Sequence, residues 1–497
     1  MRVVGFRYET LPPAFSFVLG CYLIGIALGA AFGKRLCARS EDLYQAAAIV
    51  LGVSALADVL TPWMIAHVMP SSSSGLVAPA LAIASTAALK SILFPIVHHL
   101  GSSRDGGNVG RSVSRIYFGN IVGAALGPLV TGFVALDHLS VDECFGVVAA
   151  LCLLASMSCA LMATRRVIIL VALAMALVSS AFASRTILPG PGSLATFAAG
   201  GGREYMSHFI ANRQGVIHTE RTTQGDMVYG GNVYDGMATV DADLNLNGLQ
   251  RLYVLALLHP NPKHVLFVGL SAGAWVRAMQ GFATVDSIDV VEINQGYIQL
   301  ARAYPQLAPL LDDPRVHIHI DDGRRWLRRN AGARFDAIIQ NTSFYWRANA
   351  DNLLSREYLL EVKQHLNPGG IFTANATGSF DVLATAGAVF AYAYRYTNFV
   401  YAADHPLAPD MGGLSRVMRP DGTPFVLDNP PATSVVATLE TARLEPAAAF
   451  IARRKAGAEI ITDDNLLTEY KDGRRFGPEL VQALLPPEIP HFEGADP

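Results

Sequence analysis

The strongest constraint on the fold is a division in polarity between the two parts of the chain. Residues from Leu11 to Ser184 are mostly apolar, whereas the sequence after Arg185 has the polarity of an ordinary globular protein. A helix needs about 20 mostly apolar residues to cross a bilayer. Six stretches come close to that length: about 12–33, 46–69, 76–100, 117–136, 144–163 and 167–184. We therefore predict a membrane domain of about six transmembrane helices over residues 1–184.

Small residues recur at helical spacing within these stretches. The first stretch is followed by Lys34 and Arg35 in place of a small-residue cleavage site, so we do not expect a cleaved signal peptide. Glycines at every fourth residue place small side chains on one helix face, where two backbones can approach closely. This spacing predicts tight helix packing at two sets of positions: Gly25, Gly29 and Gly33, and Gly119, Gly123 and Gly127.

Composition excludes several classes of function. A net charge of -3 without a clustered basic face gives no reason to expect nucleic acid. All five cysteines lie in the apolar part and none forms a CxxC pair, so neither a disulfide framework nor a thiolate zinc site is supported. We expect no metal, because the histidines of the polar part are widely spread in sequence.

The polar part divides into segments of different character. Residues 185–202 are rich in Gly, Pro and Ser and predict a linker. Residues 203–262 contain polar, alternating sequence with glycine turns, which is typical of a small β-rich subdomain. In residues 263–445 short apolar strands alternate with helical stretches, which predicts a doubly wound α/β domain with a parallel sheet. Residues 446–497 form a C-terminal extension.

Polar residues at the ends of the predicted strands indicate a nucleotide site. The segment HVLFVGLSAGAWVRAM places Gly269 and Gly273 in a turn between a strand and a helix, where the backbone can approach a ligand. Glu292 ends the next strand, where an acid can accept from both ribose hydroxyls. The third strand ends in Asp321 and Asp322, whose carboxylates can accept a hydrogen bond from an adenine amine. The full set expected at the nucleoside is Gly269, Ser271, Gly273, Glu292, Asp321, Asp322, Gly323 and Asn341.

The fourth strand, in FDAIIQNTSFYW, ends in an amide and three aromatic residues. A group-transfer enzyme would often use a carboxylate at this place as a base. Asn341 has no useful basicity, although it can orient an amine or a carbonyl by hydrogen bonding. Phe344, Tyr345 and Trp346 are candidates for an aromatic substrate wall, or for ordinary loop packing.

These motifs resemble those of spermidine synthases, which are aminopropyltransferases with a methyltransferase-like fold. The similar segments are VLFVGLSAGAWVRAM, VVEIN, DDPRVHIHIDDGRRWL and LLSREYLLEVKQHLNPGGI. The apolar segments AFSFVLGCYLIGIALGAAFGKRL and IYFGNIVGAALGPLVTGF, with TDDNLLTEY near the C-terminus, resemble bacterial fusions of a major-facilitator-like membrane part to such a domain. The resemblance implies a Rossmann-like S-adenosylmethionine-methyltransferase fold after a small β-rich subdomain, and S-adenosylmethionine or decarboxylated S-adenosylmethionine as co-substrate.

The chain also departs from that family. Ala272 stands where the family has an Asp that holds the aminopropyl amine, and Asn341 stands for the first Asp of its catalytic loop. We therefore expect that putrescine is not the acceptor. The expected catalytic residues are Asn341, Asp235 and Tyr234, since Tyr234 falls near the family's substrate-contacting residues. Other candidate bases are Glu220, Asp321 and the Asp463–Asp464 pair.

Three functions remain open. The first is a membrane-anchored spermidine synthase-like transferase, acting as a homodimer on a small-molecule amine or a lipid-like acceptor. The second is a methyltransferase that uses S-adenosylmethionine. The third is a polyamine or nucleoside transporter or sensor with a non-catalytic domain, for which the intramembrane charges Asp58 and Lys90 are the candidates.

Two arguments disagree about the side of the membrane on which the polar part of the chain lies. Basic residues mark the first, third and fifth loops as cytoplasmic, which would place the polar part outside with six spans: Lys34, Arg35, Arg39, Arg104, Arg111, Arg115, Arg165 and Arg166. S-adenosylmethionine is made in the cytosol, so we expect a multi-pass protein of the cell inner membrane with a cytoplasmic polar domain. The disagreement with the charge count would then be due to one miscounted span or to a start that is shortened relative to the resembled proteins.

Overall fold

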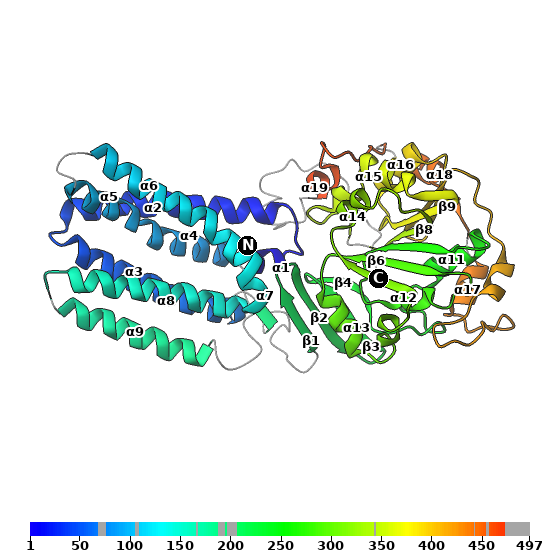
Figure 1. Ribbon diagram of the computed structural model, residues 1–497, viewed down its shortest axis with the longest axis horizontal. Helices are drawn as coiled ribbons and strands as arrows, with labels where there is room; N and C mark the ends of the chain where they lie inside the picture. Colours follow the sequence, from blue (N-terminus) through cyan, green and yellow to red (C-terminus); the bar gives the residue numbers. More distant parts are fainter. Residues whose placement is uncertain are drawn as a thin grey trace.

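The computed structural model shows a helical part and an α/β part that lie end to end along the long axis of the molecule (Figure 1). It describes residues 1–67, 76–104, 109–165, 167–186, 194–195, 206–341, 344–441, 443–453 and 457–472. The predicted linker over 185–202 lies almost entirely outside the described residues.

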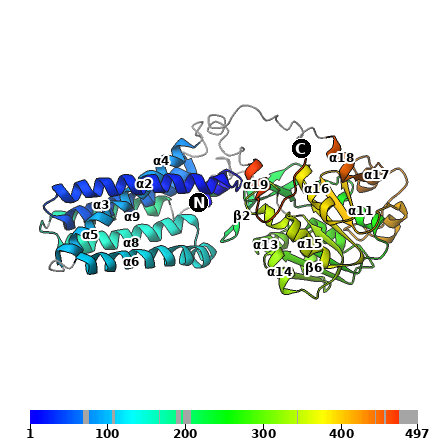
Figure 2. The same ribbon diagram turned by 90° about the horizontal axis from the view of Figure 1, so that it is seen from above.

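The helical part consists of long, roughly parallel helices (Figure 2). By length and composition, five candidate spans are able to cross a membrane: Pro13–Arg39, Leu43–Met64, Val77–Gly101, Val113–His138 and Val141–Met162. The sixth predicted span falls on a helix whose apolar stretch, Val167–Ala181, is shorter than these five. The elements are α1 (Arg2–Arg7), α2 (Pro13–Arg39), α3 (Leu43–His67), α4 (Val77–Ser91), α5 (Leu93–Arg104), α6 (Val109–Val130), the π-helix η1 (Thr131–Ala135), α7 (Leu136–His138), α8 (Val141–Met162) and α9 (Val167–Thr186).

One of the two glycine sets makes the predicted helix contact. A Cβ atom added at Gly25, Gly29 or Gly33 would collide with backbone carbonyl oxygens of α4 and the residue after it, so α2 can pack on α4 only with small residues there. At Gly119, Gly123 and Gly127 an added Cβ would meet nothing within 4 Å in the described part of the chain. The packing prediction for this second set is wrong within the described chain, because α6 presents that face outward.

The two charges within the apolar helices, Asp58 and Lys90, form an ion pair. Lys90 Nζ lies 2.6 Å from Asp58 Oδ1, and the Asp58 side chain is only 1% exposed. A buried charge is costly in an apolar medium unless it is paired. The pair therefore joins α3 to α4, and this structural role accounts for both charges.

Two sheets make up the polar part. The first is antiparallel in the order β1-β2-β3-β4, as expected for the β-rich segment: β1 (Met206–Asn212), β2 (Gly215–Thr222), β3 (Gly225–Gly230) and β4 (Val233–Met237). The second has the order β12-β10-β11-β9-β8-β5-β6-β7. Its strands are β5 (His264–Val268), β6 (Ser287–Glu292), β7 (Val316–Ile320), β8 (Phe335–Gln340), β9 (Leu366–Asn375), β10 (Tyr392–Tyr396), β11 (Phe399–Ala403) and β12 (Glu445–Pro446).

The strand pairing of the second sheet defines the fold class. Strands β7, β6, β5, β8 and β9 are parallel neighbours, and β11 joins β9 antiparallel. Strand β11 is inserted between β9 and β10 and is antiparallel to both, and the short β12 pairs antiparallel with β10 at the edge. A parallel core with an antiparallel strand inserted in this way is the Rossmann-like methyltransferase arrangement, so the predicted fold class is confirmed.

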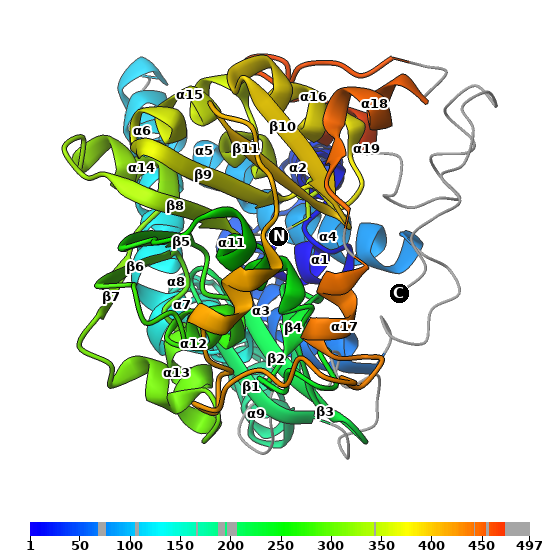
Figure 3. The ribbon, with the colours of Figure 1, turned by 90° about the vertical axis from the view of Figure 1, so that its right-hand side faces the viewer.

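Helices cover both faces of this sheet (Figure 3). Successive side chains of a strand point to opposite faces. Val265 and Phe267 accordingly join one core cluster and Leu266 and Val268 the other, which explains the continuous apolar run of β5. The helices are α11 (Gln250–Leu258), α12 (Ala274–Met279), α13 (Gly296–Ala303), α14 (Gly323–Arg329), α15 (Arg356–Gln364), α16 (Phe380–Val389), α17 (Val435–Glu440), α18 (Ala447–Ala452) and α19 (Leu467–Asp472), with 3-10 turns η3 (Ala308–Leu311), η4 (Ala350–Leu353) and η5 (Met411–Arg416).

Candidate functional site

A cavity of about 450 Å³ lies at the carboxyl ends of the parallel strands. This edge is where ligands bind in open α/β sheets. It brings together seven of the eight residues expected at a nucleoside: Gly269, Ser271, Glu292, Asp321, Asp322, Gly323 and Asn341. Gly273, the eighth, lines a second cavity of about 140 Å³ that adjoins the same turn.

Glu292 connects the ends of β5 and β6. Its carboxylate accepts hydrogen bonds from the backbone N–H of Leu270 at 2.7 Å and of Asn294 at 2.7 Å. Burial of the side chain, which is 4% exposed, raises its pKa to about 7, although these backbone donors oppose the shift. A carboxylate has about four acceptor positions, so at least one remains for a further donor beside the backbone donors Leu270, Asn294 and Ile293. Glu292 therefore fixes the glycine turn and can still accept a ligand hydroxyl.

The turn after β5 adopts a conformation that favours glycine. Gly269 and Gly273 have φ of 94° and 86°, and Ser271 between them has φ of 51°. A Cβ added at Gly273 would lie 2.7 Å from Leu310, so a larger residue would also collide. The hydroxyl of Ser271 donates to the backbone carbonyl of Asp235, which holds the turn against β4.

The two acids after β7 are held by the helix that follows them. Asp322 caps α14 by accepting from the backbone N–H of Arg325 at 2.9 Å. Asp321 pairs with Arg325 and, at 3.3 Å, with Arg329. Both residues line the larger cavity, and both already have hydrogen-bond or ion-pair partners within the chain.

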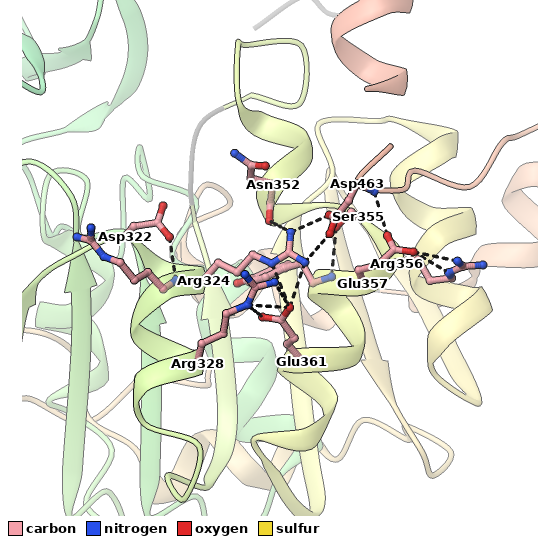
Figure 4. Close-up of polar contacts among 11 residues, drawn as sticks. Asp322, Arg324, Arg328, Asn352, Ser355, Arg356, Glu357, Glu361 and Asp463 are labelled. Carbon is pink, nitrogen blue, oxygen red and sulfur yellow. Dashed lines mark hydrogen bonds and ion pairs between the residues drawn. The ribbon is translucent and has the colours of Figure 1, made fainter. Parts of the chain in front are cut away.

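Helix α14 is in turn clamped by the C-terminal extension (Figure 4). The guanidinium of Arg324 donates to both carboxylate oxygens of Asp463, at 2.7 and 2.8 Å, and to Glu361 at 3.1 Å. Ser355 also donates to Asp463 at 2.6 Å. The hydrogen bonds from Arg324 lower the pKa of Asp463, and Asp463 lines neither cavity. The interpretation of Asp463 as a base is therefore wrong, because it is committed to this network.

Asp235 lies where the two cavities meet. It lines both of them and accepts a hydrogen bond from the hydroxyl of Tyr297. Burial raises its pKa to about 6, while Tyr297 and the charge of Arg347 lower it in part. Tyr234 beside it lines only the second cavity and is 42% exposed. Of the candidate bases, Asp235 has the surroundings best suited to accept a proton near neutral pH.

Some side chains of the loop after β8 line the cavities, and others pack into buried clusters. Asn341 lines both cavities and Phe344 lines the second. Trp346 stacks on Phe344 with ring centroids 5.4 Å apart and belongs to a buried cluster with Val4 and Val233. Tyr345 packs against two core clusters. Phe344 is thus the one aromatic of the predicted wall that reaches these cavities, because the amino-terminal segment covers Trp346.

Several lining residues escaped the sequence analysis. Thr10 accepts from Arg347 at 3.2 Å through its hydroxyl and from the N–H of Ala348 at 3.0 Å through its carbonyl. The segment before α2 thereby forms part of the wall of the larger cavity. Arg251 and Tyr297 also line the cavities. No motif marks Thr10, Arg251 or Tyr297, which lie far in sequence from the loop after β8.

Comparisons with known proteins agree with this architecture. Residues 253–385 match the family model described as spermine/spermidine synthase domain. A polyamine aminopropyltransferase of Pyrobaculum calidifontis is 35% identical over 127 residues, which cover 24% of this chain and 44% of that protein. A polyamine aminopropyltransferase of Klebsiella pneumoniae is 30% identical over 169 residues, 32% of this chain and 58% of that protein. The chain thus spans roughly half the length of these curated relatives.

Two further proteins are similar. Putrescine N-methyltransferase 4 of Nicotiana tabacum is 33% identical over 118 residues, 24% of this chain and 30% of that protein. A solved spermidine synthase in complex with the transition-state analogue AdoDATO has a TM-score of 0.37 and 20% identity, and the match covers 40% of this chain and 74% of that one. The family and sequence matches show that this chain carries a spermidine synthase-like domain of Rossmann-like methyltransferase fold.

The Arg324 network yields a prediction about stability. Arg324→Ala removes the shared partner of two carboxylates that are partly exposed, Asp463 at 37% and Glu361 at 23%, so the expected cost is about 1–2 kcal/mol. We expect the apparent melting temperature of the α/β part to fall by about 3–6 °C, measured by thermal denaturation of the purified chain. The matched control is Arg334→Ala, whose guanidinium donates only to nearby backbone carbonyls. Equal melting of the two variants would contradict a structural role for the network.

Proposed function

We propose that this chain is a membrane-anchored, spermidine synthase-like transferase that uses S-adenosylmethionine or its decarboxylated form as co-substrate. The observation that carries the proposal is the buried carboxylate of Glu292 at the end of β6, hydrogen-bonded to the glycine turn at 2.7 Å on the wall of the larger cavity. An acid at this place in a nucleotide-binding α/β domain accepts from ribose hydroxyls. The turn and Glu292 fall within the residues that match the spermine/spermidine synthase model.

The residues present suit an adenosine group. A cavity of about 450 Å³ falls within the range of small-molecule sites. Glu292 offers acceptors for the ribose, and Asp321 or Asp322 offers an acceptor for the adenine amine. Apolar Val268, Val291 and Leu353 complete the wall, which suits the faces of a base.

The acceptor is proposed to be a small amine or lipid-like molecule other than putrescine. A diamine carries two positive charges that need acidic partners. The second cavity contains one acid, Asp235, together with Arg251 and Arg347, and Ala272 and Asn341 stand at positions that carry Asp in the resembled family. This charge balance disfavours a dication.

The chemistry needs positioning and one base. A bound S-adenosyl sulfonium supplies an electrophilic carbon and a neutral thioether as leaving group. Asn341 borders both cavities and can orient the acceptor by hydrogen bonding. Asp235 is ionised above pH 6 and can take the proton that the attacking amine releases, while Tyr297 holds its carboxylate in place.

Methyl transfer is the second candidate reaction. The similarity to a putrescine N-methyltransferase favours it, since that protein shares the matched region. A transporter has less support, because Asp58 and Lys90 are paired with each other.

The location is proposed to be the cell inner membrane. The helical part exposes large apolar side chains along its spans, such as Phe118, Leu154 and Leu177, which a lipid phase would cover. We place the α/β part in the cytoplasm, where S-adenosylmethionine is made, and we expect a homodimer.

Product analysis tests the proposed function. The purified full chain is incubated with S-adenosylmethionine and, separately, with its decarboxylated form, together with a polyamine panel and a membrane lipid extract. Mass spectrometry should detect methylthioadenosine if the three-carbon arm leaves, or S-adenosylhomocysteine if the methyl group leaves. The product should be lost with Glu292→Ala. Nucleoside binding without either product would contradict the transferase and favour a sensor.

The role of Asp235 predicts a pH dependence. Both carboxylates must be ionised, so kcat/KM of the wild type should begin to fall near pH 7, where Glu292 gains a proton, and fall more steeply than tenfold per pH unit below pH 6, where Asp235 gains one too. Asp235→Asn should lower kcat/KM by about 100-fold or more and leave a shallower acidic limb that belongs to Glu292. Asp241→Asn is the matched control, because Asp241 only accepts from backbone N–H groups at a turn. An unchanged acidic limb in Asp235→Asn would exclude Asp235 as the base.

A further inference from the structure

The second cavity has an unusual cation on its wall. It lies beside the glycine turn, from Leu270 to Trp275, and shares Asp235, Ser271, Asn341 and Arg347 with the larger cavity. Ala272 contributes only a methyl group to its wall. Arg251, on α11, also lines it. The shared residues make the two cavities neighbours, so one extended ligand can occupy both.

The guanidinium of Arg251 is held rigidly by neutral groups. Its Nε donates to the carbonyl of Gly248 at 3.1 Å, Nη2 to the carbonyl of Asn247 at 3.1 Å, and Nη1 to the side chain of Asn398 at 2.8 Å. It also lies over the rings of Trp275 and Phe399, at 5.5 and 5.1 Å from their centroids. These contacts fix the plane of the guanidinium at the cavity wall.

Within the described part of the chain, no carboxylate forms an ion pair with Arg251. A largely desolvated charge without an opposite charge is costly. An arginine has five N–H donors, of which three are used here, so two remain. A carboxylate supplies both the missing charge and the acceptors for a paired hydrogen bond. The one acid that lines this cavity, Asp235, accepts from Tyr297 and forms no ion pair with Arg251 in the described structure, and the amides of Asn375 and Asn398 add no negative charge.

We propose that Arg251 binds the carboxylate of the co-substrate, so that the donor is S-adenosylmethionine and not its decarboxylated form. The proposal rests on the proposed function, since it assumes that the adenosine occupies the larger cavity. Ala272 is consistent with it, because no acid in the turn opposes a carboxylate there. The donor then keeps its whole amino acid end, with its carboxylate at Arg251.

The test compares two nucleosides that differ only in the carboxylate. Calorimetry of the purified full chain measures the dissociation constants of S-adenosylhomocysteine and of decarboxylated S-adenosylhomocysteine. We expect the wild type to bind the carboxylate form about 10- to 100-fold more tightly. Arg251→Gln should lose this preference while it binds the decarboxylated nucleoside as the wild type does.

Arg416→Gln is the matched control. Arg416 donates to the carbonyl of Ala256 on the same helix α11 and lines neither cavity, so its variant should keep the preference. Equal or tighter binding of the decarboxylated nucleoside by the wild type would overturn the proposal. It would indicate that the carboxylate that binds Arg251 belongs to the acceptor instead. If Arg251→Gln weakened the binding of both nucleosides equally, the role of Arg251 would be purely structural, which would also overturn the proposal.

The result separates this inference from the proposed function. If the wild type binds both nucleosides without preference, the transferase proposal stands and the donor assignment fails. If the wild type binds neither, the proposed function fails as well. The wild-type ratio decides the donor even if Arg251→Gln does not fold.

Discussion

The hydrogen bonds of Glu292 set the geometry on which the site depends. The carboxylate joins the turn after β5 to the turn after β6, through the N–H groups of Leu270 and Asn294. With both backbone donors satisfied inside the protein, the glycine turn keeps its strained conformation beside the cavity, and Ser271 then reaches the carbonyl of Asp235. A buried acid is costly, which shows in a pKa raised to about 7. The desolvation cost of the buried Glu292 carboxylate thus falls at the place where a ribose would donate two hydroxyl groups.

The site is also built by segments from both ends of the chain. The amino-terminal segment contacts Arg347 in the stretch after β8 through Thr10, and that segment continues into the first apolar helix. At the other end, Asp463 holds the C-terminal extension against Arg324, two residues after the cap residue Asp322. A spermidine synthase-like domain alone would lack the first of these contacts. The shape of the cavity wall is therefore tied to the helical part, which gives a physical reason for the covalent link between the two parts.

The sequence could predict the sheet and the strand-end residues because both follow from local pattern. Apolar strands alternating with helices define the parallel sheet, and its register then brings Gly269, Glu292 and Asp322 to one edge. Side chains in loops and on covering helices depend on partners far away in sequence. Sequence reasoning treated Phe344 and Trp346 alike, yet contacts with the amino-terminal segment separate them. Arg251 carries no motif, and its importance follows only from the absence of an acid around it in the described structure.

The most direct test of the central claim is a structure of the full chain determined with S-adenosylhomocysteine bound. The account predicts that the nucleoside occupies the larger cavity, with the ribose hydroxyls about 3 Å from the carboxylate of Glu292. A nucleoside bound elsewhere, or a ribose without contact to Glu292, would contradict it.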